Sequence, residues 1–388
     1  MKSNKNSMLK NNSKIKFLII LFCIFCTSQN NLEARKNAIT RTAKNCSSAV
    51  VGINVTEIRA GLVRQHSGMG SMFDFFFGPR YQHRQFEVHG NGSGFLISPC
   101  GYILTNHHVA GNASKVVVTL TNGEKYDAEI VGSDLTSDVC LLKIKGNKKF
   151  PFLKFANSDK AIVGEWAIAM GNPFGLFDIN AKPVVTVGVV SNVGISFVNR
   201  DNSNNTLDFR IYKDMIQTDA SISSGNSGGP LLNSKGKVIG INTVIFTTTQ
   251  NQQGAGSIGI GFAVPINRVK RVVDLLMKNG TVERNLNIGI SVTEINERVA
   301  NHFHLQSREG VLVHQIDNRS AAALAGIDVG DIIERVNGRR IANSDDLLIA
   351  IGDAIVGDRL RFEIVRGTQK VSISFTVPPQ SHQNQRRR

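Results

Sequence analysis

The sequence predicts a mostly β protein, with a large first part built from many short strands and a smaller second part that mixes strands and helices. Three observations carry this prediction: 36 glycines among 388 residues, a charged fraction of 19%, and short apolar runs separated by turn residues from about residue 47 onward. Such runs are typical of barrels or sandwiches. The length allows two or three domains, and the apolar fraction of 41% excludes a disordered chain.

Residues 1–34 predict export across a membrane. Lys10, Lys14 and Lys16 precede the apolar run of residues 17–26. A basic segment followed by about ten apolar residues is typical of a signal peptide, and the run is too short to span a bilayer comfortably. Cleavage after Ala34, lipidation at Cys26 and retention as a short anchor are the alternatives for its fate.

The formal charge of +15 raises the question of nucleic-acid binding. Residues 1–34 carry five lysines and one glutamate, or +4, and the three terminal arginines add +3, which leaves 15 − 4 − 3 = +8 for the rest of the chain. Because no dense block of Lys and Arg occurs there, the charge favours a solvated basic surface. We expect no nucleic-acid partner.

The first part of the chain contains a clear hairpin. Residues 116–120 and 125–131 flank Asn122-Gly123, which supplies the positive-φ turn that tight hairpins require. Further strands are predicted at residues 94–98, 102–105, 138–144, 166–170, 184–191, 238–244 and 260–264.

The first strong helical pattern follows Pro265 and ends at Gly280, a natural left-handed terminator. Its apolar residues recur at positions i, i+3, i+4 and i+7, namely Val269, Val272, Val273 and Leu276. A helix that closes a series of strands is a reasonable boundary. We therefore expect a first domain over residues 47–280.

Residues 282–378 are expected to form a second, α+β domain, followed by a disordered basic tail over residues 379–388. Its one clear helix begins at the N-cap Ser344. Its strands are predicted at residues 288–292, 311–315, 331–336, 359–366 and 370–377.

Residues 67–89 differ from their surroundings because a phenylalanine cluster at residues 73–77 lies in an otherwise polar segment, predicted to be a long loop. Such a loop in a compact domain is usually functional or disordered. Exposed phenylalanines indicate a partner surface. The alternative is that the cluster packs on its own barrel.

Beyond the signal segment the chain contains Cys46, Cys100 and Cys140, an odd number without the spacing of metal ligands. Cys140 lies in an apolar run and is expected to be a buried small hydrophobe. A disulfide between Cys46 and Cys100 stays open as an alternative.

The most informative segment is Gly225-Asn226-Ser227-Gly228-Gly229. A nucleophilic serine needs an exposed hydroxyl on a tight turn and backbone N–H groups that converge where an oxyanion forms. Gly225 can turn its amide inward, and Gly228 and Gly229 are expected to let a substrate approach. Taken alone, this motif does not exclude an ordinary β-turn.

Two further segments supply the partners that Ser227 would need. His107 and His108 follow the strand at residues 102–105 and provide a base, and Asp138 precedes an apolar strand and provides an acid. The order His, Asp, Ser along the chain is that of double-barrel serine proteases. Surface or core histidines and a capping aspartate are the structural alternatives for these residues. A metal hydrolase built on the two histidines lacks a third ligand.

At these residues the chain resembles the HtrA (Do-like, trypsin-like) serine proteases, with motifs at residues 92–98, 101–109, 133–138, 171–175, 217–220, 225–231 and 259–265. The resemblance implies a chymotrypsin-like double β-barrel over residues 47–280. It selects His108 over His107 as the catalytic histidine, with Asp138 orienting it and Ser227 as nucleophile. It also implies that Gly225, Asn226 and Ser227 frame an oxyanion hole, and that residues 67–89 are a regulatory loop between subunits.

The second domain resembles the PDZ domain of the same family, through residues 320–327, 330–333 and 336–338. Ala321 stands where a proline is common in the family motif. The resemblance implies that Asn287, Ile288, Gly289 and Ile290 form the loop that binds the carboxylate of a C-terminal peptide, while the peptide adds as a strand.

The function implied is an ATP-independent serine endopeptidase that degrades unfolded exported proteins in protein quality control and stress response. The resemblance also implies a homotrimer or larger assembly and a periplasmic location in a Gram-negative cell, and no cofactor or metal is expected. The alternative is a chaperone or peptide-binding scaffold whose protease site is idle or secondary.

Overall fold

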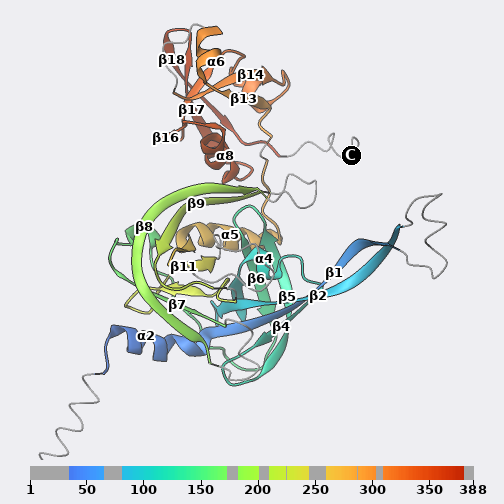
Figure 1. Cartoon of the computed structure of the whole chain (residues 1–388), viewed down its shortest axis with the longest axis vertical. Helices are drawn as coiled ribbons and strands as arrows, with labels where there is room; N and C mark the ends of the chain where they lie inside the picture. Colours follow the sequence, from blue (N-terminus) through green and yellow to red (C-terminus); the bar gives the residue numbers. More distant parts are fainter. Residues whose placement is uncertain are drawn as a thin grey trace, which may run out of the picture.

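The computed structural model describes residues 35–64, 81–172, 182–200, 209–223, 225–243, 259–285, 287–302 and 309–379. These residues form two closed barrels of six strands each, followed by a separate six-stranded sheet. Figure 1 shows the barrels together in one body and the last sheet above them. The predicted fold class, β-rich first and α+β second, is confirmed. The signal segment and the tail from residue 380 lie outside the described residues.

The first barrel has the strand order β1-β2-β3-β6-β5-β4, with every pair antiparallel. The predicted hairpin is confirmed, because Val116 pairs with Ala128 and Gly123 takes the left-handed conformation at φ 85°. The strands of this barrel are β1 (Val50–Arg64), β2 (Tyr81–Leu96), β3 (Tyr102–Thr105), β4 (Lys115–Thr119), β5 (Lys125–Asp134) and β6 (Val139–Ile144).

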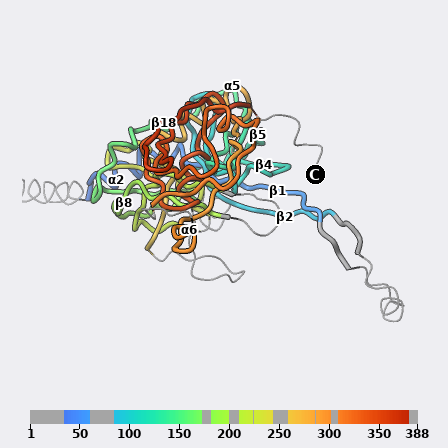
Figure 2. The backbone as a smooth tube through the Cα atoms, turned by 90° about the horizontal axis from the view of Figure 1, so that it is seen from above, coloured from blue at the N-terminus to red at the C-terminus, as the bar shows by residue number. Residues whose placement is uncertain are grey.

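Strand β1 had not been predicted, and β2 is much longer than the strand predicted at residues 94–98. Residues 81–89, which we expected in a loop, form the first half of β2 and pair with β1 as far as Arg64 and Tyr81. The polar residues there were mistaken for a loop because a two-stranded ribbon exposed on both faces lacks apolar alternation. Figure 2 shows this ribbon projecting from the barrels. Residues 65–80, with the phenylalanine cluster, lie outside the described residues.

The second barrel has the order β10-β11-β12-β9-β8-β7. Strands β9 and β10 had not been predicted, because Lys213 and Asp214 interrupt the apolar pattern of β9 and β10 has only three residues. The strands are β7 (Trp166–Gly171), β8 (Val184–Arg200), β9 (Phe209–Thr218), β10 (Pro230–Leu232), β11 (Val238–Thr243) and β12 (Gly261–Pro265).

Helix α5 (Ile266–Asn279) packs on the barrels as predicted: its four periodic apolar residues are buried, and Gly280 ends it at φ 73°. The N-terminal helix α2 (Ala38–Cys46) continues into the 3-10 turn η1 (Ser47–Ala49). The first part of the chain also contains two short helical elements, α4 (His107–Ala110) and the 3-10 turn η2 (Ser158–Lys160). No helix of the described residues has the length and apolar character needed to cross a bilayer.

The C-terminal sheet has the order β13-β14-β15-β17-β18, with β16 beside β15. Its helix α8 begins one residue earlier than predicted, because Asn343 rather than Ser344 is the N-cap and accepts the amide of Asp346 at 2.8 Å. The elements are β13 (Ile290–Glu294), α6 (Glu297–His302), β14 (Val311–Ile316), α7 (Ala321–Leu324), β15 (Ile332–Val336), β16 (Arg339–Arg340), α8 (Ser344–Gly352), β17 (Arg359–Arg366) and β18 (Gln369–Thr376).

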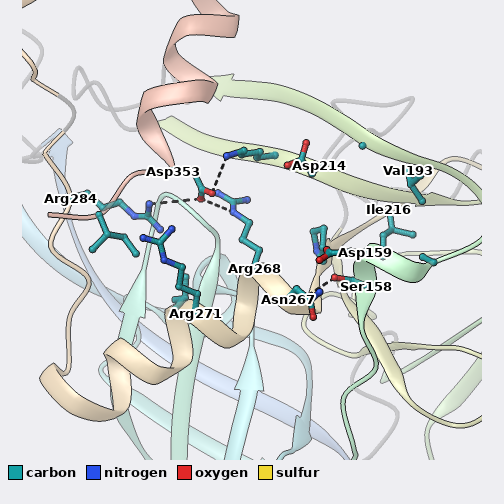
Figure 3. A pocket seen from close by; sticks show the side chains of 16 residues that line it. Ser158, Asp159, Val193, Asp214, Ile216, Asn267, Arg268, Arg271, Arg284 and Asp353 are labelled. Carbon is teal, nitrogen blue, oxygen red and sulfur yellow. Dashed lines mark hydrogen bonds and ion pairs between the residues drawn. The ribbon is translucent and has the colours of Figure 1, made fainter. Parts of the chain in front are cut away.

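The end of α8 joins the C-terminal sheet to the second barrel. Asp353 accepts Arg268 Nε at 2.9 Å and Lys213 Nζ at 3.4 Å, and Arg284 Nη1 lies 3.9 Å away. Asp353, Arg268 and Arg284 are labelled in Figure 3, and with Lys213 they belong to the lining of a cavity of about 310 Å³. Burial alone would raise the pKa of Asp353, but the three cations hold it below its ordinary value. The junction therefore contains an ionised carboxylate at neutral pH.

Candidate active site

His108 and Asp138 form a direct pair at the junction of α4 and β6. His108 Nδ1 lies 2.8 Å from Asp138 Oδ2 and 3.0 Å from Oδ1, and the backbone N–H of His108 donates to Oδ1 at 3.0 Å. Asp138 is fully buried, whereas the His108 side chain is one-quarter exposed. The imidazole therefore has one nitrogen fixed by the carboxylate while part of the ring faces solvent.

A strained turn holds Asp138 in this position. Its φ of 57° lies in the left-handed region, which Asp tolerates better than most residues. The Asp138 N–H donates to the carbonyl of Leu135 at 3.2 Å, and Asn106 Nδ2 donates to the carbonyl of Asp138 at 3.0 Å. Asn106 also donates to Thr243 Oγ1 of the second barrel. The two barrels thus jointly fix the backbone of Asp138.

Asp138 stays ionised despite its burial. Desolvation by itself would raise the pKa of its carboxyl, but the charge and hydrogen bonds of His108, together with the charge of Arg210, hold that pKa below its ordinary value. An ionised, buried carboxylate next to an imidazole can orient the ring and stabilise it when it is protonated.

His107 is not part of this pair, because its side chain packs inside the protein. Its side chain is buried, and its ring fills the space that a Cβ on Gly111 would occupy. Burial lowers the pKa of His107, so the ring is neutral at physiological pH. The geometry thus distinguishes the two histidines, which residue patterns alone did not.

The turn that carries Ser227 is fastened to β2. Ser93 donates its N–H to the carbonyl of Ser227 at 2.9 Å and its hydroxyl to the carbonyl of Gly225. Gly225 and Gly228 both have positive φ, 93° and 86°. These glycines give the turn the backbone conformation that side-chain-bearing residues rarely adopt.

At Gly228 and Gly229 the protein itself fills the space that a Cβ would need. A Cβ on Gly228 would lie 2.1 Å from the carbonyl oxygen of Ser93 and 2.3 Å from Thr105 Oγ1. A Cβ on Gly229 would lie 2.1 Å from the carbonyl oxygen of Met170. These contacts require glycine at both positions, and the approach of a substrate past them stays a prediction.

His108, Gly225 and Ser227 line one pocket of about 340 Å³. The fold thus brings the predicted histidine and serine to the same cavity, although 119 positions separate them in the chain. Asn226 is buried beside them, and its amide donates to the carbonyl of Ser223 at 3.0 Å. The remaining lining residues come mostly from the β1–β2 ribbon and are Val55, Glu57, Arg59, Val88, Gly90, Asn91 and Val109.

Two residues that contact this site were missed from the sequence. Ser93 holds the serine turn, and Tyr212 donates its hydroxyl to Asp138 Oδ2 at 3.3 Å. Ser93 could have been found, because it stands between Gly92 and Gly94 in a motif of the resemblance. Tyr212 had no such signal, because it lies in the strand β9 that was not predicted.

The predicted peptide loop begins the C-terminal sheet. Ile288 is buried, Gly289 has φ 86°, and Ile290 is the first residue of the edge strand β13. Asn287 Oδ1 accepts the amide of Gly289 at 3.1 Å, so this amide already has a partner within the loop. The edge position of β13 leaves one side of the strand open to a further strand among the described elements.

The three described cysteines are free: Cys46 and Cys140 are buried and Cys100 is exposed, so the alternative of a Cys46–Cys100 disulfide is not realised. Burial raises the pKa of the Cys140 thiol to about 12, as suits a small hydrophobe. Among the described residues, no group of three or more His, Cys, Asp and Glu could hold a metal ion.

Each of the two parts of the fold matches a known domain family. Residues 92–241 match the trypsin-like peptidase domain, and residues 286–377 match the PDZ domain. A Pseudomonas putida protein named probable periplasmic serine endoprotease DegP-like is 38% identical over 353 residues, which cover 87% of this chain and 69% of the relative. The chain belongs to the HtrA family of DegP-like serine endoproteases. Its C-terminal sheet is accordingly the PDZ domain of the HtrA protein.

Other HtrA relatives extend further than this chain. A Chlamydia trachomatis DegP-like protein is 41% identical over 309 residues, and Escherichia coli periplasmic serine endoprotease DegP is 39% identical over 295 residues. The matches cover 79% and 76% of this chain but 58% of each relative. The solved structure "HtrA-type protease AlgW with decapeptide" aligns with a TM-score of 0.63 at 29% identity, covering 88% of this chain and 99% of that one.

Proposed function

We propose that this HtrA protein is an ATP-independent serine endopeptidase with His108, Asp138 and Ser227 as its catalytic residues. The supporting observation is that His108, paired with the buried Asp138, lines the same pocket as Ser227. The names of the DegP-like relatives agree with this activity. We take its substrates to be unfolded exported proteins, whose extended segments can enter an active-site cleft.

In the proposed reaction, the Ser227 hydroxyl attacks a peptide carbonyl while His108 Nε2 takes the hydroxyl proton. A bond forms between Oγ and the carbonyl carbon. The C–N bond then breaks as His108 gives that proton to the leaving amine. A water molecule next attacks the acyl-enzyme, with His108 again as base, and releases the acid and Ser227. Asp138 remains ionised throughout and stabilises the protonated imidazole.

We assign the oxyanion hole to the segment Gly225, Asn226 and Ser227, with the amides of Gly225 and Ser227 as the donors. Asn226 acts as the spacer between them, because its own amide donates to Ser223. Preorganised backbone N–H groups aimed at the developing oxyanion are the usual form of such a site. Losing one such donor costs about 3–4 kcal/mol of transition-state stabilisation.

The proposal includes the arrangement of the whole chain. Residues 1–34 act as the export signal, residues 47–280 as the protease domain and residues 282–378 as the PDZ domain. The periplasmic names of the relatives support export to that compartment. Asn287, Ile288, Gly289 and Ile290 would hold the end of a C-terminal peptide, and the chain would assemble as a homotrimer or larger homo-oligomer.

A fluorophosphonate probe tests the proposal, because it labels only an activated serine. The full chain is incubated with the probe and, separately, with unfolded casein. We expect labelling and digestion by the wild type and by Ser234→Ala, a half-buried serine in the turn after β10. We expect neither by Ser227→Ala or His108→Ala. A folded wild type that is not labelled, yet still suppresses aggregation of unfolded protein, would support the scaffold alternative.

A further inference from the structure

Tyr212 connects the second barrel to the carboxylate of the first. It lies in β9 with 1% of its surface exposed, and its hydroxyl donates to Asp138 Oδ2 at 3.3 Å. The hydroxyl thus reaches the carboxylate that orients His108 rather than the imidazole itself. Its effect on the reaction therefore acts through Asp138.

Two contacts restrain Tyr212, one at the backbone next to it and one at its ring. The amide of the preceding residue, Ile211, donates to the carbonyl of Thr136 at 2.9 Å, in the turn that leads to Asp138. The ring itself packs against Phe197 of β8, with centroids 5.2 Å apart. Because the backbone and the ring are both held, the hydrogen bond from the hydroxyl to Asp138 costs little additional side-chain entropy.

The Tyr212 hydroxyl is the second of two donors to Asp138 Oδ2. Oδ1 accepts two bonds from His108, from its backbone N–H and from Nδ1, whereas Oδ2 accepts Nδ1 and Tyr212. Asp138 is fully buried, so bulk water does not reach its second oxygen. A buried carboxylate oxygen that loses a donor incurs a desolvation penalty and gains freedom to rotate.

Tyr212 also stays protonated and can always donate. Burial, and secondarily the negative charge of Asp138, raise the pKa of its phenol above the ordinary value. The hydroxyl is therefore a permanent donor over the pH range in which the protein is folded.

We propose that Tyr212 is a positioning residue that fixes the rotation of the Asp138 carboxylate, and through it the ring of His108. This inference rests on the proposed serine endopeptidase function. When the hydroxyl is absent, the carboxylate turns away from the plane in which it accepts Nδ1–H, and the imidazole spends less time aligned with Ser227. The step affected is proton transfer, whereas substrate binding in the pocket is left unchanged.

The test compares Tyr212→Phe with Tyr126→Phe. The control also removes a tyrosine hydroxyl that donates to a carboxylate, but this one is the exposed Glu124 of the β4–β5 hairpin. For a peptide substrate, we expect Tyr212→Phe to lower kcat about three- to tenfold at unchanged KM, because the lost bond is long. The rate of fluorophosphonate labelling should fall by a similar factor, and the downfield proton resonance of His108 Nδ1–H should broaden. Tyr126→Phe should match the wild type in all three.

The labelling rate constant reports only on folded, reactive molecules, so partial unfolding of Tyr212→Phe does not imitate the effect. A kcat within twofold of wild type together with an unchanged Nδ1–H resonance overturns the inference about Tyr212. A three- to tenfold rise of KM at unchanged kcat also overturns the inference, because it would indicate that the substrate pocket is disturbed. If the wild type itself shows no Ser227-dependent hydrolysis, the proposed function fails instead.

Discussion

Asp134 and Arg284 form a two-point ion pair between the turn that leads to Asp138 and the segment that leads into the PDZ domain. Arg284 Nε lies 3.0 Å from Asp134 Oδ1, and Arg284 Nη2 lies 2.7 Å from Oδ2. The side chain of Arg284 is only 7% exposed and that of Asp134 only 5%. Asp134 also accepts the amide of Ser137, so one carboxylate shapes the turn and contacts the interdomain segment.

Breaking this pair should weaken both the fold and the reaction. Arg284→Met keeps the volume of the side chain but leaves Asp134 buried without its cation, which costs about 3 kcal/mol or more. We expect a lower urea midpoint and a reduced kcat, because the turn before Asp138 loosens. Arg340→Met is the matched control, since its partner Glu309 is exposed and such pairs contribute roughly 0–1 kcal/mol. Equal midpoints for the two variants would contradict the prediction.

Asp138→Asn should retain the fold and lose the reaction. Asparagine tolerates the left-handed backbone at this position, but its amide cannot accept the His108 Nδ1 proton in the same way. In serine proteases with this geometry, such a change lowers kcat about 10⁴-fold. Asp214→Asn is the control, because Asp214 also has positive φ, 53°, but lies exposed at the domain junction. Hydrolysis rates at saturating substrate compare the two variants, and comparable rates would remove Asp138 from its proposed role.

Comparing Gly228→Ala with Gly123→Ala distinguishes the cost of backbone strain from the cost of a steric clash of the added Cβ. The two glycines have nearly the same φ, 86° and 85°, so either alanine pays roughly 1–2 kcal/mol for the left-handed backbone. Only at Gly228 does the added Cβ meet Ser93 and Thr105, whereas at Gly123 no atom lies within 4 Å. We expect Gly123→Ala to stay active and Gly228→Ala to lose fluorophosphonate labelling. A labelled, stable Gly228→Ala would show that the serine turn can move away from β2.

The Asp353 junction should weaken in acid. Because the cations lower the pKa of Asp353 in the folded protein below its ordinary value of 3.8, the carboxylate stabilises the fold above that pH. This contribution is lost as the pH falls through the lowered pKa. Asp353→Asn should thus be less stable than wild type at pH 7, and the difference in urea midpoint should narrow below pH 3.8. Asp159→Asn, an exposed residue of the same cavity, should match the wild type at both pH values.

Local sequence signals predicted most strands and the long helix. The Asn122-Gly123 turn and the periodic valines of α5 determine structure through neighbouring residues, so a pattern over a few positions suffices. The long ribbon and β9 were missed because their polar residues follow no such pattern. Residues 81–89 are held as a strand by their pairing with β1.

The candidate site was predictable only in part for a related reason. His108, Asp138 and Ser227 were named from motifs, but the contacts that hold them join positions far apart in the chain. Tyr212 and Asp138 are separated by 74 positions, and Ser93 and Gly225 by 132. Partners of this kind follow from the packing of two barrels against each other, which periodicity along one chain does not encode.

The ribbon of β1 and β2 has a consequence for the lifetime of the protein. Among the described strands, β1 pairs with β4 only over Gly52–Thr56, so residues 57–64 are hydrogen-bonded to β2 alone. A two-stranded segment with open edges is marginally stable, so it opens more easily than the barrels. Among its described side chains, Ile58 and Phe86 are apolar and exposed. We therefore expect self-digestion between molecules to begin in this ribbon, at a rate that rises with the square of the protein concentration.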